Sequence, residues 1–358
     1  MNNERLTTLQ TALKKAKMDV LLISDPHSIE YLLGKMIHPG ERMLVLAVFQ
    51  KQAPVFFLNH LFNVPEDFGF EKVWFYDTDD YTGMLASYLD QASVIGVDKN
   101  WPARFLLPVM ANVPQAHFVN GSYLVDEMRM VKDEAERQLM REASLINDQA
   151  MADMRQTFEE GITENEMAAK LLEFYKAHGG EGYSFEPIVG YGPNGADGHH
   201  GCDQTPLKPG DSIVVDMGCM YQGYCSDMTR TFFYKSVTPK QREVYDLVLQ
   251  ANLAAEAIIK PGVRLCDIDK AARDVITKAG YGPMFNHRTG HFIGKEVHEY
   301  GDVSSAFDMP VRAGMIFSIE PGIYIEGEFG VRIEDLVLVT EDGCEILNHY
   351  PKDLIVIE

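Results

Sequence analysis

The chain has 358 residues, of which 46% are hydrophobic and 24% are charged. This composition excludes a disordered or low-complexity protein, and the length fits two folded domains. Lys and Arg total 32 against 53 Asp and Glu, a formal net charge of -21, so nucleic acid and anionic membrane surfaces are not expected as partners.

The N-terminal sequence MNNERLTTLQ has neither the basic start nor the apolar run of a secretion signal. No segment approaches the roughly 20 apolar residues that span a bilayer. The five cysteines form no CxxC pair, so neither a disulfide framework nor a thiolate zinc site is expected. We therefore predict a cytoplasmic protein.

Residues 1–125 alternate between helical and strand patterns. Leu6, Leu9 and Leu13 have the spacing of an amphipathic helix over residues 5–16. Strands are predicted at residues 19–23, 43–49, 54–58, 72–76, 94–97 and 117–119. Helical patterns fall between the later strands, so this part is predicted to be an α/β domain.

The segment 36–42 contains Pro39 and Gly40 together with ionisable side chains. It is predicted to be an exposed loop rather than part of the sheet. A solvated turn is one interpretation; a binding role for His38 or Arg42 is the alternative.

Residues 126–358 contain the same order of elements twice, about 100 residues apart. Each copy has two helices followed by a β-hairpin. The helices are predicted over 132–158, 163–177, 241–259 and 267–279, and the hairpins over 212–233 and 315–339. Two copies related by a pseudo-two-fold axis would bring both hairpins to one centre.

Each hairpin carries an acidic residue in an apolar setting. Asp216 lies in the strand Ile213-Val-Val-Asp-Met217, and Glu320 follows the apolar run 315–319. An ionised carboxylate is costly in such a strand unless it is paired or coordinated. A duplication that binds nothing is the alternative, although four facing carboxylates without a cation would repel strongly.

The second strand of each hairpin adds another carboxylate. Asp227 is a candidate ligand, with pairing to Arg230 as the alternative. Glu334 is a further candidate, with a surface ion pair to Arg332 as the alternative. His291 stands between two glycine-containing turns, which allow the backbone to approach a site closely.

Four carboxylates and one imidazole form an oxygen-rich set that suits hard or borderline divalent ions. Manganese is the first choice, and cobalt, iron or zinc are alternatives. Four negative charges balance two dications, and such a pair would acidify a bridging water, which is the expected nucleophile. The pattern predicts a two-metal hydrolase.

The ordered motifs of the second domain are similar to those of the pita-bread metallopeptidases, which include Xaa-Pro dipeptidase (prolidase), aminopeptidase P and methionine aminopeptidase. They are Asp216, Asp227, GHFIG at 290–294, VHE at 297–299, SIEPG at 318–322 and VRIED at 331–335. The resemblance implies an α/β creatinase-like domain at residues 1–125. It implies an α+β pita-bread catalytic domain with an internal pseudo-two-fold repeat at 126–358.

The resemblance also implies the role of each residue. The resemblance implies two metal ions. Asp216 binds one ion, His291 and Glu320 bind the other, and Asp227 and Glu334 bridge both. His298 is expected to contact the scissile carbonyl oxygen, and Glu320 to handle the proton of the metal-bound water. His199 or His200 matches the substrate-side histidine of the family, and the adjacent pair leaves the register open; a flexible polar loop is the alternative.

The sequence departs from the prolidase pattern at one position. Prolidases usually carry an arginine between the VHE and SIEPG motifs that receives the dipeptide carboxylate, whereas here the only arginine in that stretch is Arg312. Arg332 and His38 are candidate substrate-binding residues. His38 is a candidate, together with Arg42, because in dimers of the family the first domain can reach the active site of the partner subunit. A homodimer is therefore implied.

These features favour a dinuclear-metal exopeptidase that cleaves Xaa-Pro bonds in proline-containing peptides, as a dipeptidase. Aminopeptidase P, which acts on longer Xaa-Pro-Yaa peptides, is the near alternative. A metal-free creatinase-like hydrolase or a non-catalytic binding protein of the same fold is the alternative from another class.

Overall fold

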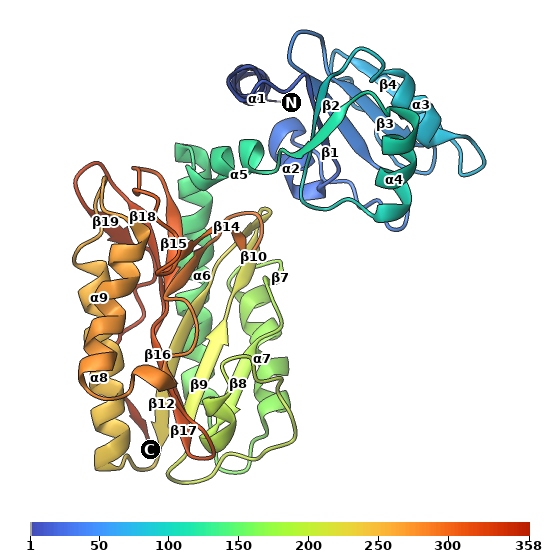
Figure 1. Cartoon of the computed structure of the whole chain (residues 1–358). Helices are drawn as coiled ribbons and strands as arrows, with labels where there is room; N and C mark the ends of the chain where they lie inside the picture. The colour runs from blue at the N-terminus through green and yellow to red at the C-terminus, as the bar shows by residue number, and fades with distance from the viewer. Residues whose placement is uncertain (1) are drawn as a thin grey trace. The chain divides into compact units, whose positions relative to one another are not determined.

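The computed structural model describes residues 2–358 and divides into two compact units. The first ends at Arg129, and the second comprises Met130–Glu358; the sequence prediction places the boundary after residue 125. Figure 1 shows the elements of each unit. Across residues 2–358, the helices are all too short or too polar to cross a membrane.

The first unit is built on a six-stranded mixed sheet with the order β4-β3-β2-β1-β5-β6. Strand β1 pairs in parallel with β5 and antiparallel with β2. The strands are β1 (Val20–Ile23), β2 (Val45–Phe49), β3 (Val55–Asn59), β4 (Glu71–Phe75), β5 (Val94–Val97) and β6 (His117–Asn120).

Helices cover both faces of this sheet because its strands are apolar on both sides. Leu21 and Ile23 of β1 pack with α1, α2 and α5, whereas Val20 and Leu22 pack with α3 and α4. The helices are α1 (Asn3–Ala16), α2 (Pro26–Leu33), α3 (Tyr81–Ser87), α4 (Ala103–Asn112) and α5 (Tyr123–Met130).

Two of these helices were not predicted from the sequence. Helix α2 begins with Asp25 as its N-cap, whose side chain accepts a hydrogen bond from the Ser28 amide, and with Pro26 in its first turn. This Asp-Pro start is a recognisable helix signal. Helix α5 follows β6 after a short turn. Residues 35–42 are irregular.

The second unit contains two helical pairs, each followed in the chain by strands. Helices α6 and α7 pack against each other, as do α8 and α9. Capping boxes begin α6, α7 and α8, as at Thr163 with Glu166. The helices are α6 (Glu134–Thr157), α7 (Glu164–Ala177), α8 (Pro239–Glu256) and α9 (Leu265–Lys278), with short 3-10 turns η1 (Gly192–Ala196) and η2 (Gly282–Met284).

The first half contributes a four-stranded sheet of order β20-β12-β9-β8. Strands β9 and β12 pair antiparallel, with Asp216 opposite Thr229. Between them the chain forms a small hairpin that joins a separate three-stranded sheet of order β11-β10-β7. The strands are β7 (Gly182–Tyr183), β8 (Ile188–Tyr191), β9 (Ser212–Met217), β10 (Cys219–Tyr221), β11 (Tyr224–Cys225), β12 (Met228–Tyr234) and β20 (Val356–Ile357).

The second half contributes a five-stranded sheet of order β14-β13-β15-β18-β19 and a two-stranded sheet of β16 and β17. The prediction of one continuous hairpin over 315–339 is therefore wrong in detail. The ladder is interrupted at Glu320-Pro321 and at Ile333-Glu334, because Pro321 has no amide hydrogen to donate. The strands are β13 (Gly290–Phe292), β14 (Glu299–Val303), β15 (Ile316–Ile319), β16 (Gly322–Ile325), β17 (Phe329–Arg332), β18 (Asp335–Val339) and β19 (Cys344–Ile346).

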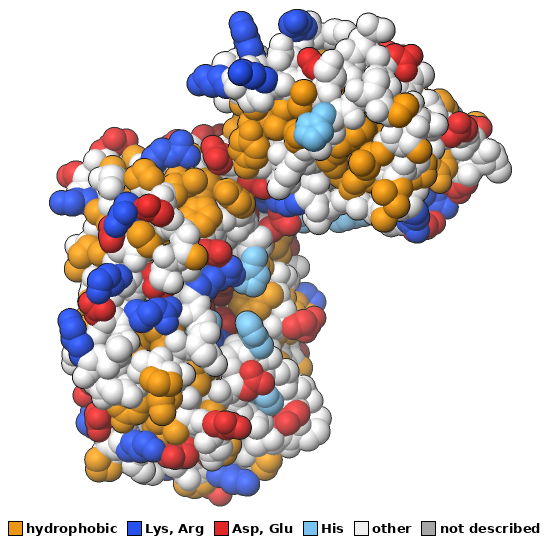
Figure 2. All heavy atoms as spheres, in the orientation of Figure 1, with side chains coloured by type: hydrophobic (Ala, Val, Ile, Leu, Met, Phe, Trp, Pro, Cys, Tyr) orange, Lys and Arg blue, Asp and Glu red, His pale blue; other side chains and the backbone are white. Residues whose placement is uncertain are grey.

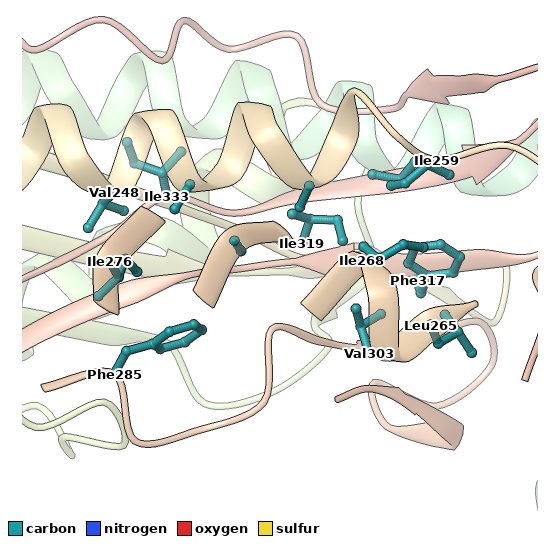
Figure 3. Close-up of a cluster of buried hydrophobic side chains, with 14 of the residues drawn as sticks. Val248, Ile259, Leu265, Ile268, Ile276, Phe285, Val303, Phe317, Ile319 and Ile333 are labelled. Carbon is teal, nitrogen blue, oxygen red and sulfur yellow. The ribbon is translucent and has the colours of Figure 1, made fainter. Parts of the chain in front are cut away.

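Each helical pair forms a core with the strands of its own half. Side chains of α6 and α7, such as Met154 and Leu171, pack with Val215 of β9. In the other half, Figure 3 shows Ile268 of α9 next to Phe317 of β15, within the cluster formed with α8. The two cores leave the inner ends of β9, β12, β15 and β18 to carry polar residues.

Candidate metal centre and substrate cavity

The acidic residues of both halves line one cavity of 630 Å³ in the second unit. Figure 2 shows histidine and acidic side chains gathered on one face of this unit. Apolar side chains also contribute to the wall. The lining includes Phe185, Ile188, His199, Asp216, Asp227, His287, Arg288, His291, Val297, His298, Glu320, Arg332 and Glu334.

Asp216 is held by a buried guanidinium on one side only. Arg332 Nη2 donates to Asp216 Oδ2 at 2.6 Å, whereas Oδ1 is buried without a hydrogen-bond partner in residues 2–358. The rest of the guanidinium is bonded to Thr229, Tyr324 and the Gly198 carbonyl. The alternative surface pair of Arg332 with Glu334 is therefore replaced by a buried pair with Asp216.

Asp227 and Glu334 are both almost completely buried. Glu334 Oε2 accepts a hydrogen bond from Thr229 Oγ1 at 2.7 Å. The second oxygens, Oε1 of Glu334 and Oδ1 of Asp227, have no partner among the described residues. Arg230, the alternative partner for Asp227, donates instead to Asp335. Burial raises the pKa of both carboxyls well above the ordinary value, and the neighbouring carboxylates add to the shift.

His291 presents its Nε2 to these carboxylates. Its Nδ1 lies 3.2 Å from the Phe292 carbonyl oxygen, which can only accept, so the hydrogen is on Nδ1 and the Nε2 lone pair is free. Nε2 lies 3.6 Å from Asp227 Oδ2 and 3.5 Å from Glu320 Oε1. Burial, followed by the nearby His298 and Arg288, lowers the pKa of His291 to about 3. The ring is therefore neutral and able to act as a ligand.

Glu320 lies at the break between β15 and β16. Its amide donates to the Thr289 carbonyl at 2.7 Å, and its Oε1 accepts from Ser318 Oγ at 3.2 Å. Burial and the charge of Asp216, acting against the opposing charge of Arg332, raise the pKa of Glu320 to about 7. A carboxyl in this range can exchange a proton near neutral pH.

The chemistry of the five residues fits a divalent metal centre. Ligand atoms of Asp227, His291 and Glu334 all lie within 4.8 Å of one another, and Asp216 and Glu320 line the same cavity. Three buried carboxylate oxygens have no hydrogen-bond partner within residues 2–358, which is costly unless a cation or a proton neutralises them. Oxygen ligands with one imidazole suit hard or borderline ions.

Close backbone contact lets β13 carry His291 into this centre. A Cβ atom on Gly290 would lie 1.8 Å from the Ser318 carbonyl oxygen, so a side chain there would force β13 and β15 apart. The His291 amide also donates to Ser318 Oγ at 3.0 Å. The absence of a side chain at Gly290 therefore allows β13 to pack this closely on Ser318 of β15.

His298 lies beside His291, with ring centroids 4.3 Å apart. The turn that carries it is fastened by the adjacent Glu299, which accepts from the Lys295 amide at 2.9 Å and from Lys132 Nζ at 3.0 Å. Burial, with the charge of Arg288, lowers the pKa of His298. A neutral imidazole at the cavity wall can donate a hydrogen bond to a carbonyl oxygen.

The adjacent histidines of the loop after η1 point to different places. His199 lines the cavity, whereas His200 Nε2 lies 2.7 Å from Oε2 of the buried Glu164. Glu164 also accepts hydrogen bonds from the amides of Tyr191 and Asp203. His199 therefore lies on the cavity and His200 in the hydrogen-bond network that holds the loop; the role of either ring in binding substrate stays a prediction.

The remaining candidates lie elsewhere. His38 is exposed in the first unit, and Arg42 is bonded to Asp77 there, with Nε to Oδ1 at 3.0 Å. Their proposed role at a partner's site stays a prediction. Arg312 is exposed in the second unit and is not among the residues that line the cavity.

Sequence reasoning did not identify His287 and Arg288 of the cavity wall, or Tyr324, which is bonded to the wall residue Arg332. Tyr324 accepts from Arg332 at 2.8 Å and lies 3.0 Å from His287 Nε2, so the three form a hydrogen-bonded chain beneath the site. Arg288, adjacent to His287, is a second guanidinium on the wall. A signal for Tyr324 is its position in the β16–β17 hairpin, near Arg332 on the opposite strand.

Comparison with protein families identifies the family of this chain. The model of Metallopeptidase family M24 matches residues 138–341, and that of the Creatinase/Prolidase N-terminal domain matches residues 5–131. The chain belongs to metallopeptidase family M24. This confirms the predicted family, the metallopeptidase class and the fold class of a creatinase-like domain followed by a pita-bread domain.

Relatives of this M24 chain cover it from end to end. A protein named "Putative dipeptidase YkvY" from Bacillus subtilis is 36% identical over 99% of both chains. One named "Xaa-Pro dipeptidase" from Lactobacillus helveticus is 35% identical over 98% of both. The crystal structure of dipeptidase PepE from Mycobacterium ulcerans has a TM-score of 0.94 and 35% identity, covering 99% of this chain and 97% of that one.

Proposed function

We propose that this M24 metallopeptidase is an Xaa-Pro dipeptidase that hydrolyses the bond between an N-terminal residue and a C-terminal proline. The observation that carries the proposal is the buried set of Asp216, Asp227, His291, Glu320 and Glu334 around one cavity. The similarity to the Lactobacillus helveticus protein, which is named for that activity, supports the substrate class.

The five ligand residues would hold two divalent ions, with manganese as the first choice and cobalt, iron or zinc as alternatives. When bound, such ions supply positive charge that acidifies water and polarises a carbonyl oxygen. One oxygen each of Asp216, Asp227 and Glu334 is buried without a hydrogen-bond partner in the described part of the chain, which supports this assignment.

The chain's own side chains perform the remaining steps. We assign to Glu320 the proton that leaves the attacking water and later reaches the proline nitrogen, because it is a carboxyl of the cavity wall, with Oε1 3.5 Å from His291 Nε2. His298 donates a hydrogen bond to the scissile carbonyl oxygen as negative charge develops there. His199, in the loop after η1, contacts the substrate from the cavity wall. Arg332 orients Asp216 through the hydrogen bond from its Nη2 to Asp216 Oδ2, and so supports the site without touching the substrate.

A homodimer and a cytoplasmic location complete the proposal as predictions from the sequence. In a dimer, His38 would be available to a partner's cavity, which size measurement in solution together with a His38→Ala variant can test.

The proposal is tested with purified protein and a panel of added metals. Xaa-Pro dipeptides and Xaa-Pro-Yaa tripeptides are compared at matched concentration, with Xaa-Ala dipeptides as the control for proline selectivity. We expect metal-dependent cleavage with a preference for Xaa-Pro. A clear preference for tripeptides would overturn the dipeptidase assignment in favour of aminopeptidase P, and activity unaffected by chelation would favour the metal-free alternative.

A further inference from the structure

His199 lines the cavity from an exposed position on the loop that joins β8 to β9. Within residues 2–358 its side chain makes no hydrogen bond, and only its backbone is fixed. The His199 amide donates to Asp197 Oδ1 at 3.0 Å, and the His200 amide donates to the Asp197 carbonyl oxygen at 3.2 Å. The place of the imidazole at the cavity therefore depends on what holds the loop, residues 191–205.

One buried carboxylate holds this loop at four points. Glu164, the first residue of α7, is completely buried. Its Oε1 accepts from the Tyr191 amide at 2.9 Å and from Asn194 Nδ2 at 3.0 Å. Its Oε2 accepts from the Asp203 amide at 3.1 Å and lies 2.7 Å from His200 Nε2. The four partners are spread along nearly the whole loop, so a single side chain determines its path.

The backbone at the start of α7 binds the end of the same loop. The Glu164 amide donates to the Thr205 carbonyl oxygen at 3.2 Å, and the Asn165 amide donates to the Asp203 carbonyl oxygen at 3.1 Å. Thr205 Oγ1 also accepts from Asn194 Nδ2 at 3.1 Å. A carboxylate in the first turn of a helix is stabilised by the partial positive charge of that end. The first turn of α7 is therefore the fixed point of the loop.

The bonding of Glu164 differs from that of the carboxylates at the metal centre. Ligand atoms of Glu164, His200 and Asp203 lie within 4.8 Å of one another. Both oxygens of Glu164, however, already have two partners each, whereas Asp216 keeps a buried oxygen without a partner in the described residues. A cation at Glu164 would have to displace the bonds that hold the loop. The arrangement therefore fits a positioning network rather than a cation site.

We propose that Glu164 is a positioning residue, which places His199 against the substrate by holding the loop at 191–205. The inference rests on the proposed function, in which His199 contacts the substrate. A displacement of about 1 Å is enough to weaken such a contact. Gln at position 164 would keep the shape but not the bonds, because its NH2 group would face the main-chain amide of Tyr191 or Asp203, whichever way it is turned.

The test measures kcat and KM of the metal-loaded full-length enzyme with an Xaa-Pro dipeptide. Glu164→Gln should raise KM about 5- to 10-fold with a smaller change in kcat, and by no more than His199→Gln does, because it acts through that ring. The double variant should have the KM of His199→Gln alone. Effects on KM that multiply in the double variant would overturn the proposal.

Asp148→Asn is the matched control for a purely structural effect. Asp148 is another buried carboxylate of the second unit. It accepts from the amides of His349 and Tyr350 at 2.6 and 3.1 Å and does not line the cavity. Both Asp148→Asn and Glu164→Gln should lower the urea midpoint of unfolding, but only Glu164→Gln should raise KM. An equal rise of KM in both would contradict the positioning role.

A milder variant keeps the test available if Glu164→Gln does not fold. Asn194→Ala removes one of the four bonds to Glu164, together with the bond to Thr205. We expect KM to rise about 2- to 3-fold, again without effect in the His199→Gln background. The same rise in that background would overturn the proposal.

Failure of the positioning role and failure of the proposed function give different results. If the parent cleaves Xaa-Pro dipeptides and Glu164→Gln keeps the parental KM, only the positioning role is wrong. If the parent cleaves no Xaa-Pro peptide, the function is wrong, and amide hydrogen exchange over residues 191–205 then tests the network directly. Exchange there that is at least about 10-fold faster in Glu164→Gln than in Asp148→Asn supports the network; exchange as in the parent overturns it.

Discussion

Two buried clusters of charge meet at the neighbouring residues Glu334 and Asp335, and they are balanced differently. Asp335 pairs with Arg230 at 2.7 Å and with Lys352 at 2.8 Å. Lys352 in turn contacts Glu256 at 2.9 Å. In this cluster two cations face two anions, so each buried charge has a partner and the cluster ties β12, β18, α8 and the C-terminal segment together.

The cluster around Glu334 has four carboxylates and one guanidinium. Asp216, Asp227 and Glu334 each keep an oxygen without a hydrogen-bond partner among the described residues. The first cluster is complete as a structural element, whereas the second has an excess of carboxyl groups that must be neutralised by protons or by a bound cation. The difference shows that charge balance, rather than burial, distinguishes a structural ion-pair cluster from a cation-binding site.

The largest effect is expected where the negative charge itself is removed. Glu334→Gln keeps the shape of the side chain but takes away one ligand charge. Peptidase activity should fall at least about 1,000-fold, because charge stabilisation by bound metal is worth several kcal/mol. Elemental analysis should show less metal per chain. Retention of both metals and of parental activity would refute the metal-centre assignment.

At the next residue, Asp335, we expect a substitution to reduce stability rather than metal binding. Asp335→Asn leaves the buried Arg230 and Lys352 with less compensation and should lower the free energy of unfolding by about 3 to 5 kcal/mol. Urea unfolding of chelator-treated protein measures this. Asp308→Asn, at an exposed surface pair, is the control and should change stability by less than about 0.5 kcal/mol. Equal effects of both substitutions would contradict the structural role of the first cluster.

One carboxyl from each cluster, Glu320 and Asp335, should also respond to pH with opposite sign in the metal-free protein. The folded-state pKa of Glu320 is raised to about 7 from an ordinary 4.5, so its contribution is present below pH 4.5 and is lost as pH rises through 7. The pKa of Asp335 is lowered in the folded protein by Arg230 and Lys352 against the cost of burial, so its contribution is lost as pH falls.

Glu320→Gln isolates the first of these effects. The stability of the parent relative to the variant should fall by about 3 kcal/mol between pH 4 and pH 8. Chemical unfolding of both proteins after chelation gives this difference at each pH. A difference that stays constant over this range would show that Glu320 does not titrate abnormally.

The smallest effects concern the adjacent histidines. His199→Gln should raise KM for Xaa-Pro about 10-fold with little change in stability, because the ring lines the cavity. His200→Gln should lower the free energy of unfolding by about 1 kcal/mol through its bond to Glu164. Each variant is the control for the other, and a reversal of the two results would mean that the loop is oriented differently.

The sequence predicts the elements whose periodicity is strong and local. The four long helices and the paired strands of the second unit follow from apolar spacing and capping residues such as Thr163. The ligand set could also be proposed, because charges in apolar strands stand out. Their roles in binding metal remain predictions.

What could not be predicted depends on contacts between distant parts of the chain. The contact of Arg332 with Asp216 joins residues 116 positions apart. The orientation of His200 depends on Glu164, which lies 36 residues earlier. The break at Glu320-Pro321 was visible as a proline, but its effect on the ladder depends on which strands lie alongside.

The close contact between Gly195 and Gly330 has a consequence for how the protein is made. A Cβ on Gly330 would lie 1.8 Å from the Gly195 carbonyl oxygen, so the loop that carries His199 packs directly on the backbone of β17. During synthesis this loop leaves the ribosome long before β17 exists, and it cannot reach its final position until nearly the whole chain has emerged. The cavity is therefore assembled late, and a nascent chain stays inactive until its last strands have joined the sheet.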